Sequence, residues 1–248
     1  MTEERVYRQQ AENGLEMQHL VIGETDLAIY LPEGIWNEKS RQALADELIQ
    51  SRSRLQAFIC RYPEFASSHS PLILPDTAPP EAVAMARAAA EAGVGPMAAV
   101  AGFFAGAAGR FIVHKLGAAQ VIVENGGDIY IEGGEDRNIG IFAGEDNPFS
   151  GRLAAVLKKE LFPCGVCTSS GTLGSSFSYG KADAAMVVAA DPALADAAAT
   201  AAANRVNSPE DVELACDWVM SLPGIKAALI ICEMQLAAAG ELELCSLG

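Results

Sequence analysis

The stretch VIVENGGDIYIEGG, Val121 to Gly134, decides the fold of this chain. Two runs rich in β-branched and apolar residues flank Asn125, Gly126 and Gly127, a pattern that predicts two strands joined by a tight turn. A type I′ hairpin turn favours Asn-Gly and accounts for Asn125 and Gly126. It does not account for a second glycine followed by a carboxylate. Gly127 and Asp128 therefore predict a corner at which a ligand approaches the backbone.

The composition narrows the class of protein. The 248 residues are 50% hydrophobic, enough for a sizeable core, and carry a net charge of −15. Such an acidic chain argues against nucleic acid and anionic membranes as partners, because both require basic patches. The polar opening MTEERVYRQQAENG does not resemble a secretory signal, and the six cysteines show no disulfide framework. We therefore expect a cytoplasmic protein with free thiols.

Helices are expected on the N-terminal side of the opening stretch. Residues 6–31 read as extended, with a turn at Gly23-Glu24, and residues 37–59 as a helix. PPEAVAMARAAAEAG predicts a helix that begins at its prolines and ends at Gly93. The next helix runs from Pro96 to Leu116. Its uncharged composition reads as a buried helix, with a membrane span as the minor alternative. It carries a stripe of small residues, which lets another element come very close: Ala98, Gly102, Ala105 and Gly109.

A similar order of elements follows on the C-terminal side. NIGIFAG and AAMVVAAD read as strands, and Asp191-Pro192 signals the start of a helix that runs to about Val206. A near capping box at Ser208 begins another helix, and KAALIICEM and ELELC close the chain as strands. The order predicts an α+β fold of duplicated units, in which two helices are inserted between strand pairs. We expect one domain, 1–248, built from approximate halves 1–145 and 146–248.

Two short motifs are better explained by structure than by function. GVGPMA, from Gly93, fits the dinucleotide pattern but follows a helix instead of a strand, so it reads as a helix stop and a new start. Cys164 and Cys167 form a lone C-x-x-C. It has no second pair for zinc, and no helix follows for a redox site, so two buried thiols are the favoured interpretation. The histidines are scattered, and no catalytic triad can be argued from them.

Two other segments carry candidate ligand-binding groups. TSSGTLGSSFSYG, from Thr168, is dense in hydroxyls and glycine. Its backbone N–H groups could hold an anion near Ser170 and Gly171, although composition alone favours a flexible linker. Asp196 and Thr200 stand four apart on a predicted helix, so they share a face. A carboxylate and a hydroxyl are the oxygen ligands that Mg²⁺ takes, although dipole and backbone contacts explain each residue equally well.

Two segments taken together resemble the ApbE-like superfamily, whose best-known members are FAD:protein FMN transferases. MAAVAGFFAGAAGRFIVHKLGAAQVIVENGGDIYI is similar to the family's small-residue helix and Gly-Gly-Asp-Ile turn. AMVVAADPALADAAATAA is similar to its strand and helix with an Ala-Asp-Ala-x-Ala-Thr-Ala core. The resemblance covers roughly residues 95–206.

The resemblance implies a fold, a reaction and a site. The fold is a pair of T-fold-like α+β units. Asp196 and Thr200 would hold Mg²⁺ against the FAD pyrophosphate, with Gly126, Gly127 and Asp128 near the flavin nucleotide. The reaction is transfer of FMN from FAD to a Ser or Thr of an acceptor protein, with release of AMP. Two alternatives stay open: a non-catalytic protein that binds a small ligand in the same cleft, and an interaction module whose small-residue helix forms a homodimer or larger oligomer.

Overall fold

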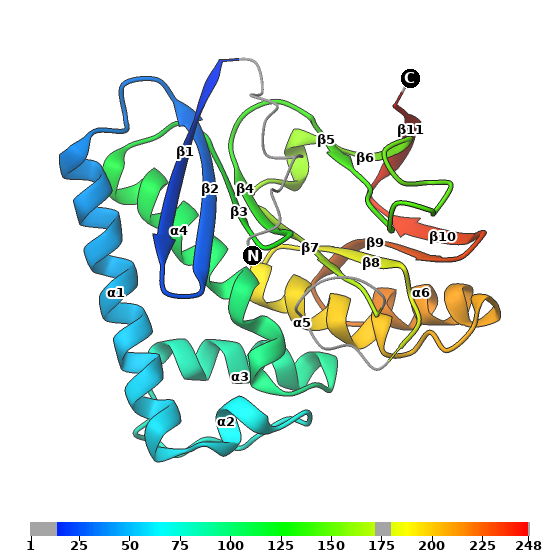
Figure 1. Ribbon diagram of the computed structural model, residues 1–248, viewed down its shortest axis with the longest axis horizontal. Helices are drawn as coiled ribbons and strands as arrows, with labels where there is room; N and C mark the ends of the chain where they lie inside the picture. Colours follow the sequence, from blue (N-terminus) through cyan, green and yellow to red (C-terminus); the bar gives the residue numbers. More distant parts are fainter. Residues whose placement is uncertain (1–13, 172–179, 248) are drawn as a thin grey trace.

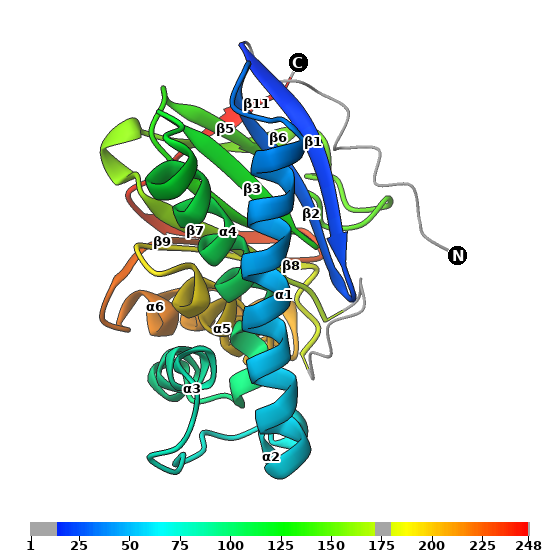
Figure 2. The same cartoon turned by 90° about the vertical axis from the view of Figure 1, so that its left-hand side faces the viewer.

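The computed structural model describes residues 14–171 and 180–247 and has three layers (Figure 1). An eight-stranded antiparallel sheet lies in the middle, with the α-helices against one face and a three-stranded sheet against the other. Figure 2 shows the small sheet at the opposite end of the molecule from α3. This mixed, antiparallel arrangement confirms the coarse fold class.

The first part of the chain places four α-helices between two hairpins. The hairpin of β1 (Leu15–Ile22) and β2 (Thr25–Pro32) is followed by α1 (Glu38–Arg61), α2 (Glu64–Ser67), α3 (Pro80–Ala92), the 3₁₀ turn η2 (Pro96–Ala99) and α4 (Val100–Leu116). The second hairpin is β3 (Val121–Asn125) and β4 (Asp128–Glu132). The helix ends are those the sequence predicts, because Asn37 caps α1, and Gly93 and Gly117 end α3 and α4 with positive φ.

The second part repeats this order with shorter connections. After β5 (Arg137–Gly140), β6 (Leu153–Leu157) and η3 (Lys159–Leu161), the chain forms β7 (Cys164–Ser169) and β8 (Ala184–Ala189). Then come α5 (Pro192–Ala203), η4 (Pro209–Asp211) and α6 (Val212–Met220), and finally β9 (Ile225–Cys232), β10 (Gln235–Gly240) and β11 (Glu243–Ser246). Asp191 caps α5, and Ser208 and Asp211 form the expected capping box.

The large sheet has the strand order β1-β2-β3-β4-β7-β8-β9-β10, and every neighbouring pair is antiparallel. The middle junction pairs β4 with β7 through Ile129↔Val166, Tyr130↔Gly165 and Ile131↔Cys164. The strands β5, β6 and β11 form the second sheet. The site discussed below lies on the helical side of this middle junction.

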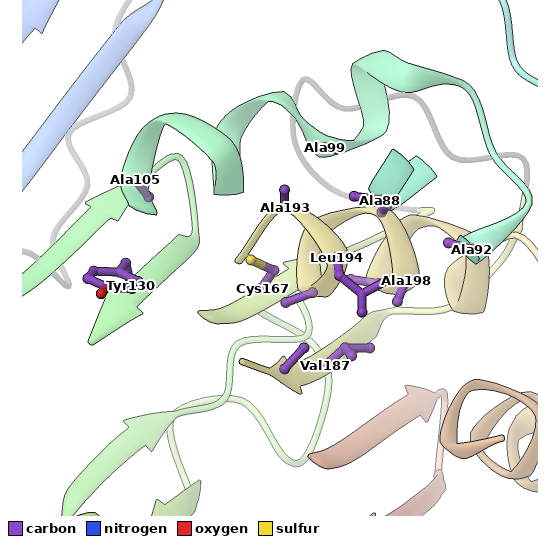
Figure 3. Close-up of a cluster of buried hydrophobic side chains, with 14 of the residues drawn as sticks. Ala88, Ala92, Ala99, Ala105, Tyr130, Cys167, Val187, Ala193, Leu194 and Ala198 are labelled. Carbon is purple, nitrogen blue, oxygen red and sulfur yellow. The ribbon is translucent and has the colours of Figure 1, made fainter. Parts of the chain in front are cut away.

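Each face of the large sheet buries its own core, because successive side chains of a strand alternate between faces. Val123, Tyr130 and Val187 belong to the larger core beneath the helices. Ile122, Ile131 and Val188 belong to the smaller core beneath the three-stranded sheet. Figure 3 shows part of the larger core, with Tyr130 and Cys167 on the strand side and Leu194 on α5.

Several local expectations are wrong. The strands β6 and β10 were not predicted. Thr168 and Ser169 belong to β7, where a loop was expected, and residues 172–179 of that expected loop lie outside the described residues. The helix α5 ends at Ala203, a few residues early. The strand near the C-terminus, β11, pairs with β6 in the small sheet.

The segment Pro96–Leu116 is long and apolar enough to cross a membrane by length and composition. Half of its most apolar 18-residue stretch is buried within the fold. This burial favours the core-helix interpretation, since α4 packs on β3, β4 and α5.

Candidate functional site

The glycine corner is a two-residue hairpin turn between β3 and β4. Asn125 pairs with Asp128, and the two residues between them have positive φ, 70° at Gly126 and 103° at Gly127. A type I′ turn needs positive φ at both central positions, so the turn itself requires both glycines. The expectation that the hairpin leaves Gly127 unexplained is therefore wrong. The Glu124 carboxylate accepts a hydrogen bond from the Gly127 N–H over 2.6 Å and braces the corner.

The helix α5 leaves two side chains open among buried alanines. Asp196 and Thr200 are half-buried, and every other residue of Pro192–Ala203 is buried. The four-residue spacing places the two on one face, as the sequence predicts. Only this face of α5 can therefore present polar groups to a ligand.

The first turn of α4 meets α5 at Asp196. The Gly102 N–H donates to Asp196 Oδ2 over 2.9 Å, and the Ala101 N–H also donates to this carboxylate. The Asn125 side-chain amide donates to the Ala101 carbonyl over 3.0 Å. Ala101 and Gly102 thus connect the hairpin end to α5, so the glycine corner and Asp196 are neighbours in space.

Glycines make this close packing possible. A Cβ on Gly102 would lie 2.2 Å from the Pro192 carbonyl oxygen, and one on Gly165 would lie 2.3 Å from the Pro192 Cα. A Cβ on Gly109 would lie 2.1 Å from the Tyr130 ring. The small-residue stripe of α4 therefore does what the sequence predicts: it lets α5 and β4 approach its backbone.

Two carboxylates face each other across this junction. Burial and the nearby charge of Asp196 raise the pKa of Asp128 well above its ordinary value, although the Cys167 thiol and the Thr168 N–H donate hydrogen bonds to it. Burial raises the pKa of Asp196 to about 7, against the lowering effect of the Gly102 and Ala101 N–H groups. A divalent cation between the two carboxylates would neutralise their charge and remove their mutual repulsion.

The donor set fits Mg²⁺ as a partial site. Two carboxylates and the Thr200 hydroxyl are hard oxygen ligands, and Mg²⁺ usually keeps waters and ligand oxygens in its other positions. Within residues 14–171 and 180–247, no group of three or more His, Cys, Asp or Glu side chains is arranged to hold a metal ion. A cation here would therefore depend on oxygen atoms supplied by its ligand.

Cys164 and Cys167 point to opposite faces of the sheet, because they are three positions apart on one strand and successive side chains alternate. Cys164 belongs to the smaller core and Cys167 to the larger one, where it lies beneath α5 (Figure 3). Burial raises the pKa of Cys164 to about 12 and also raises the pKa of Cys167. The two thiols are buried, as expected, and their strand positions exclude a disulfide between them.

Ser170 and Gly171 lie just beyond β7. The Gly171 N–H donates to the Ala182 carbonyl over 2.9 Å, and the Ser170 hydroxyl donates to the same oxygen over 3.4 Å. An anion bound here would compete with these bonds. Of the other two glycines in this segment, Gly174 lies outside the described residues and Gly180 is buried.

Sequence reasoning missed three contributors to the site: Cys167 as a donor to Asp128, Asn125 as a brace on Ala101, and Gly102 as a donor to Asp196. The small-residue stripe indicated a close approach at Gly102 but not which element approaches.

Two surface hollows lie elsewhere, one beside α6 and β10 and one beside α3. Neither is lined by Asp128, Asp196 or Thr200.

Comparisons with known proteins agree on one family. The family model described as AbpE bacteria matches residues 8–221. A UPF0280 protein of Methanocella arvoryzae is 39% identical over 208 residues, which is 84% of this chain and 84% of that protein. A UPF0280 protein of Methanosphaerula palustris is 44% identical over 188 residues, 76% of each chain.

Solved structures show the same fold at low sequence identity. The apo form of the Pseudomonas stutzeri flavinyl transferase ApbE superposes with a TM-score of 0.52 at 14% identity, covering 91% of this chain and 94% of that one. A flavin transferase ApbE from Vibrio cholerae gives 0.51 at 14% identity, covering 92% and 97%.

Proposed function

The chain belongs to the AbpE bacteria family and to the wider ApbE-like superfamily, and from this premise we propose that it binds a flavin nucleotide and transfers FMN from FAD. The acceptor would be a Ser or Thr hydroxyl of a protein. Its oxygen would attack the FMN phosphorus, a phosphodiester would form, and the pyrophosphate bond would break to release AMP. We also propose that the protein acts in the cytoplasm.

One observation carries this proposal: Asp128 and Asp196 are held close together beside the only open polar face of α5. Proteins bury like charges together at a cost, which a bound cation removes. We therefore assign Asp196 and Thr200 to Mg²⁺, and Gly126, Gly127 and Asp128 to the nucleotide. Ser170 and Gly171 are proposed as further nucleotide contacts.

Bound Mg²⁺ would neutralise the charge of the pyrophosphate. The residues around it would position the nucleotide. The Asn125 and Glu124 side chains hold the corner and the first turn of α4 in place, and the Cys167 thiol lies beside both Asp128 and the Pro192 carbonyl. With a net charge of −15, the chain has few cations to spare for phosphates, which favours a metal ion in this role.

The halves 1–145 and 146–248 would each be one T-fold-like unit. The first unit would be β1-β2, α1 to α4 and β3-β4; the second would be β7-β8, α5-α6 and β9-β10. The support is that each set begins and ends with an antiparallel pair and inserts helices between. The proposed site uses residues of both units, since Asp128 comes from the first and Asp196 from the second.

A competing, purely structural role has its own support. The Asp196 carboxylate already accepts two N–H groups from the start of α4, which has no cap from its own N-cap residue, Ala99. In that case the protein would bind a small ligand without catalysis, or would act only through its surface.

The experiment mixes the pure protein with FAD and Mg²⁺ and follows flavin fluorescence, AMP release and the protein mass. We expect Mg²⁺-dependent binding in the wild type and its loss in Asp196→Asn and Thr200→Val. Asp191→Asn is the matched control, because it removes one charge from the N-cap of the same helix, and asparagine caps equally well.

Three outcomes separate the alternatives. AMP release with an FMN-sized mass increase on an added acceptor supports transfer. Binding without AMP supports the non-catalytic protein. If FAD does not bind with or without Mg²⁺, or if Asp196→Asn binds it as wild type does, the site assignment is wrong.

A further inference from the structure

An apolar surface lies on α3 and the segment before it, at the end of the molecule away from the small sheet (Figure 2). We call it the α3 patch: residues 72–76 and the outward face of Pro80–Ala92. Ile73 is fully exposed, and Val83 is 50% exposed. Beside Ile73 is a hollow whose lining includes Leu72, Leu74, Val83 and Ala86.

The outward face of α3 is richer in apolar residues than an ordinary solvated helix face. Pro80, Val83, Arg87 and Ala90 follow one another at three- and four-residue spacing, and all are exposed. Exposed helix faces are usually dominated by charged and polar residues. Of the five exposed residues of α3, three are apolar, Pro80, Val83 and Ala90, and the two charged ones are Arg87 and Glu91. A single exposed isoleucine is normal on a protein surface. Ile73, however, lies next to a hollow and to an apolar helix face, and a contiguous exposed apolar patch usually marks an interaction surface.

The shape of the patch fits a second copy of itself. In a two-fold dimer, each subunit presents the same surface, so that surface must contain both a projection and a recess for the projection of its partner. The α3 patch has both, because Ile73 protrudes beside the hollow formed by Leu72, Leu74 and Val83.

The charges at the hollow are also self-complementary. Asp76 and Arg87 both line it, with opposite sign. A two-fold axis that passes between Asp76 and Arg87 would bring the acid of one copy towards the base of the other and would fix the register of the pair. Within its own chain, the Arg87 guanidinium also pairs with Asp191 over 3.5 Å.

We propose that the α3 patch is the interface of a homodimer, in which Ile73 of each copy enters the apolar hollow of the other. The interface is separate from the site at Asp128 and Asp196, so it stands whether or not the protein binds flavin.

The test is sedimentation equilibrium of the full chain over a wide concentration range. We expect a dimer for the wild type, a dissociation constant at least about 30-fold weaker for Ile73→Arg, and a near-wild-type value for Ile73→Leu. The matched control is Leu214→Arg on α6, which places the same charge at another exposed aliphatic residue, 71% exposed and outside the patch. We expect it to leave the dimer intact.

A charge exchange tests the register. Asp76→Arg alone should weaken the dimer, and adding Arg87→Asp should restore part of the lost affinity. Circular dichroism of each variant checks that it folds. A monomeric wild type at every concentration, an unchanged dimer in Ile73→Arg, or a dimer broken by Leu214→Arg would each overturn the proposal.

Discussion

Substitution of Gly102 by alanine tests the close contact between α4 and α5. In a solvated helix this change is stabilising, by about 1 kcal/mol, because alanine has the higher helix propensity. Here the new Cβ would lie 2.2 Å from the Pro192 carbonyl oxygen and 2.8 Å from the Asp196 Cβ. Ordinary contacts between such atoms are about 3.5 Å, so the two helices would have to separate by about 1 Å.

The clash should outweigh the gain in propensity. Overpacking of a well-packed interior costs about 1–3 kcal/mol, and the upper end applies because backbone atoms cannot rotate away. The net loss is then about 2 kcal/mol, which for a chain of this length lowers Tm by about 4–8 °C. The separation would also lengthen the bond from the Gly102 N–H to Asp196, so the change should weaken any ligand bound there.

Thermal and urea unfolding, followed by circular dichroism, measure this effect. Ala107→Gly, in the same helix at a half-buried position, is the control for propensity, and should cost about 1 kcal/mol. The reasoning would be refuted if Gly102→Ala were as stable as the wild type or more stable, because the helices would then have room that the structure denies them.

Three further predictions concern charges and the hairpin turn. In the absence of metal, the pKa of Asp196 is raised to about 7 in the folded state. Between pH 5 and pH 7 the folded state therefore holds a proton that the unfolded state has released. The free energy of unfolding should fall by about 3 kcal/mol from pH 5 to pH 8. Urea titrations in EDTA should show this slope in the wild type but much less of it in Asp196→Asn, and equal slopes would contradict the assignment. Arg54→Met should destabilise the protein by about 3 kcal/mol, because the buried Glu81 would lose its ion pair. Burial alone would raise the pKa of Glu81, but the hydrogen bonds from Arg54 and Ser51 lower it. Chemical unfolding at pH 7 measures this, and a loss below about 1 kcal/mol would show that water replaces the guanidinium. Gly127→Val should lower the free energy of unfolding by about 2 kcal/mol through backbone strain alone, since φ is 103° and a Cβ there would meet open space. A flavin titration run beside the melting curve separates this loss from an effect on ligand binding. An unchanged melting temperature would show that the turn relaxes.

The helices were the more predictable part of the fold, because their ends carry local signals. Asn37, Gly93, Gly117 and Asp191-Pro192 mark helix ends that depend on neighbouring residues only. The missed strands lack such signals. LAAVL in β6 and QLAAAG in β10 are rich in alanine, which has low strand propensity, and they become strands through pairing with distant partners.

The site was predictable one residue at a time but not as an assembly. The four-residue spacing placed Asp196 and Thr200 on one face, which the structure confirms. It could not show that this face meets the start of α4, because that contact joins residues 94 positions apart. Similarly, the end of β7 looked like a loop because the segment from Thr168 is dense in hydroxyls and glycine. Gly165, earlier in the same strand, is what lets Pro192 lie against it.

The bond from the Gly102 amide to Asp196 also has a consequence for protein synthesis. Because synthesis runs from the N-terminus, the first hairpins and α4 leave the ribosome before Asp196 does. Until then the first turn of α4 lacks its acceptor, and Asp128 lacks its neighbouring charge. A ligand of this junction can therefore bind only after α5 has been synthesised, and a fragment that ends before α5 should not bind it.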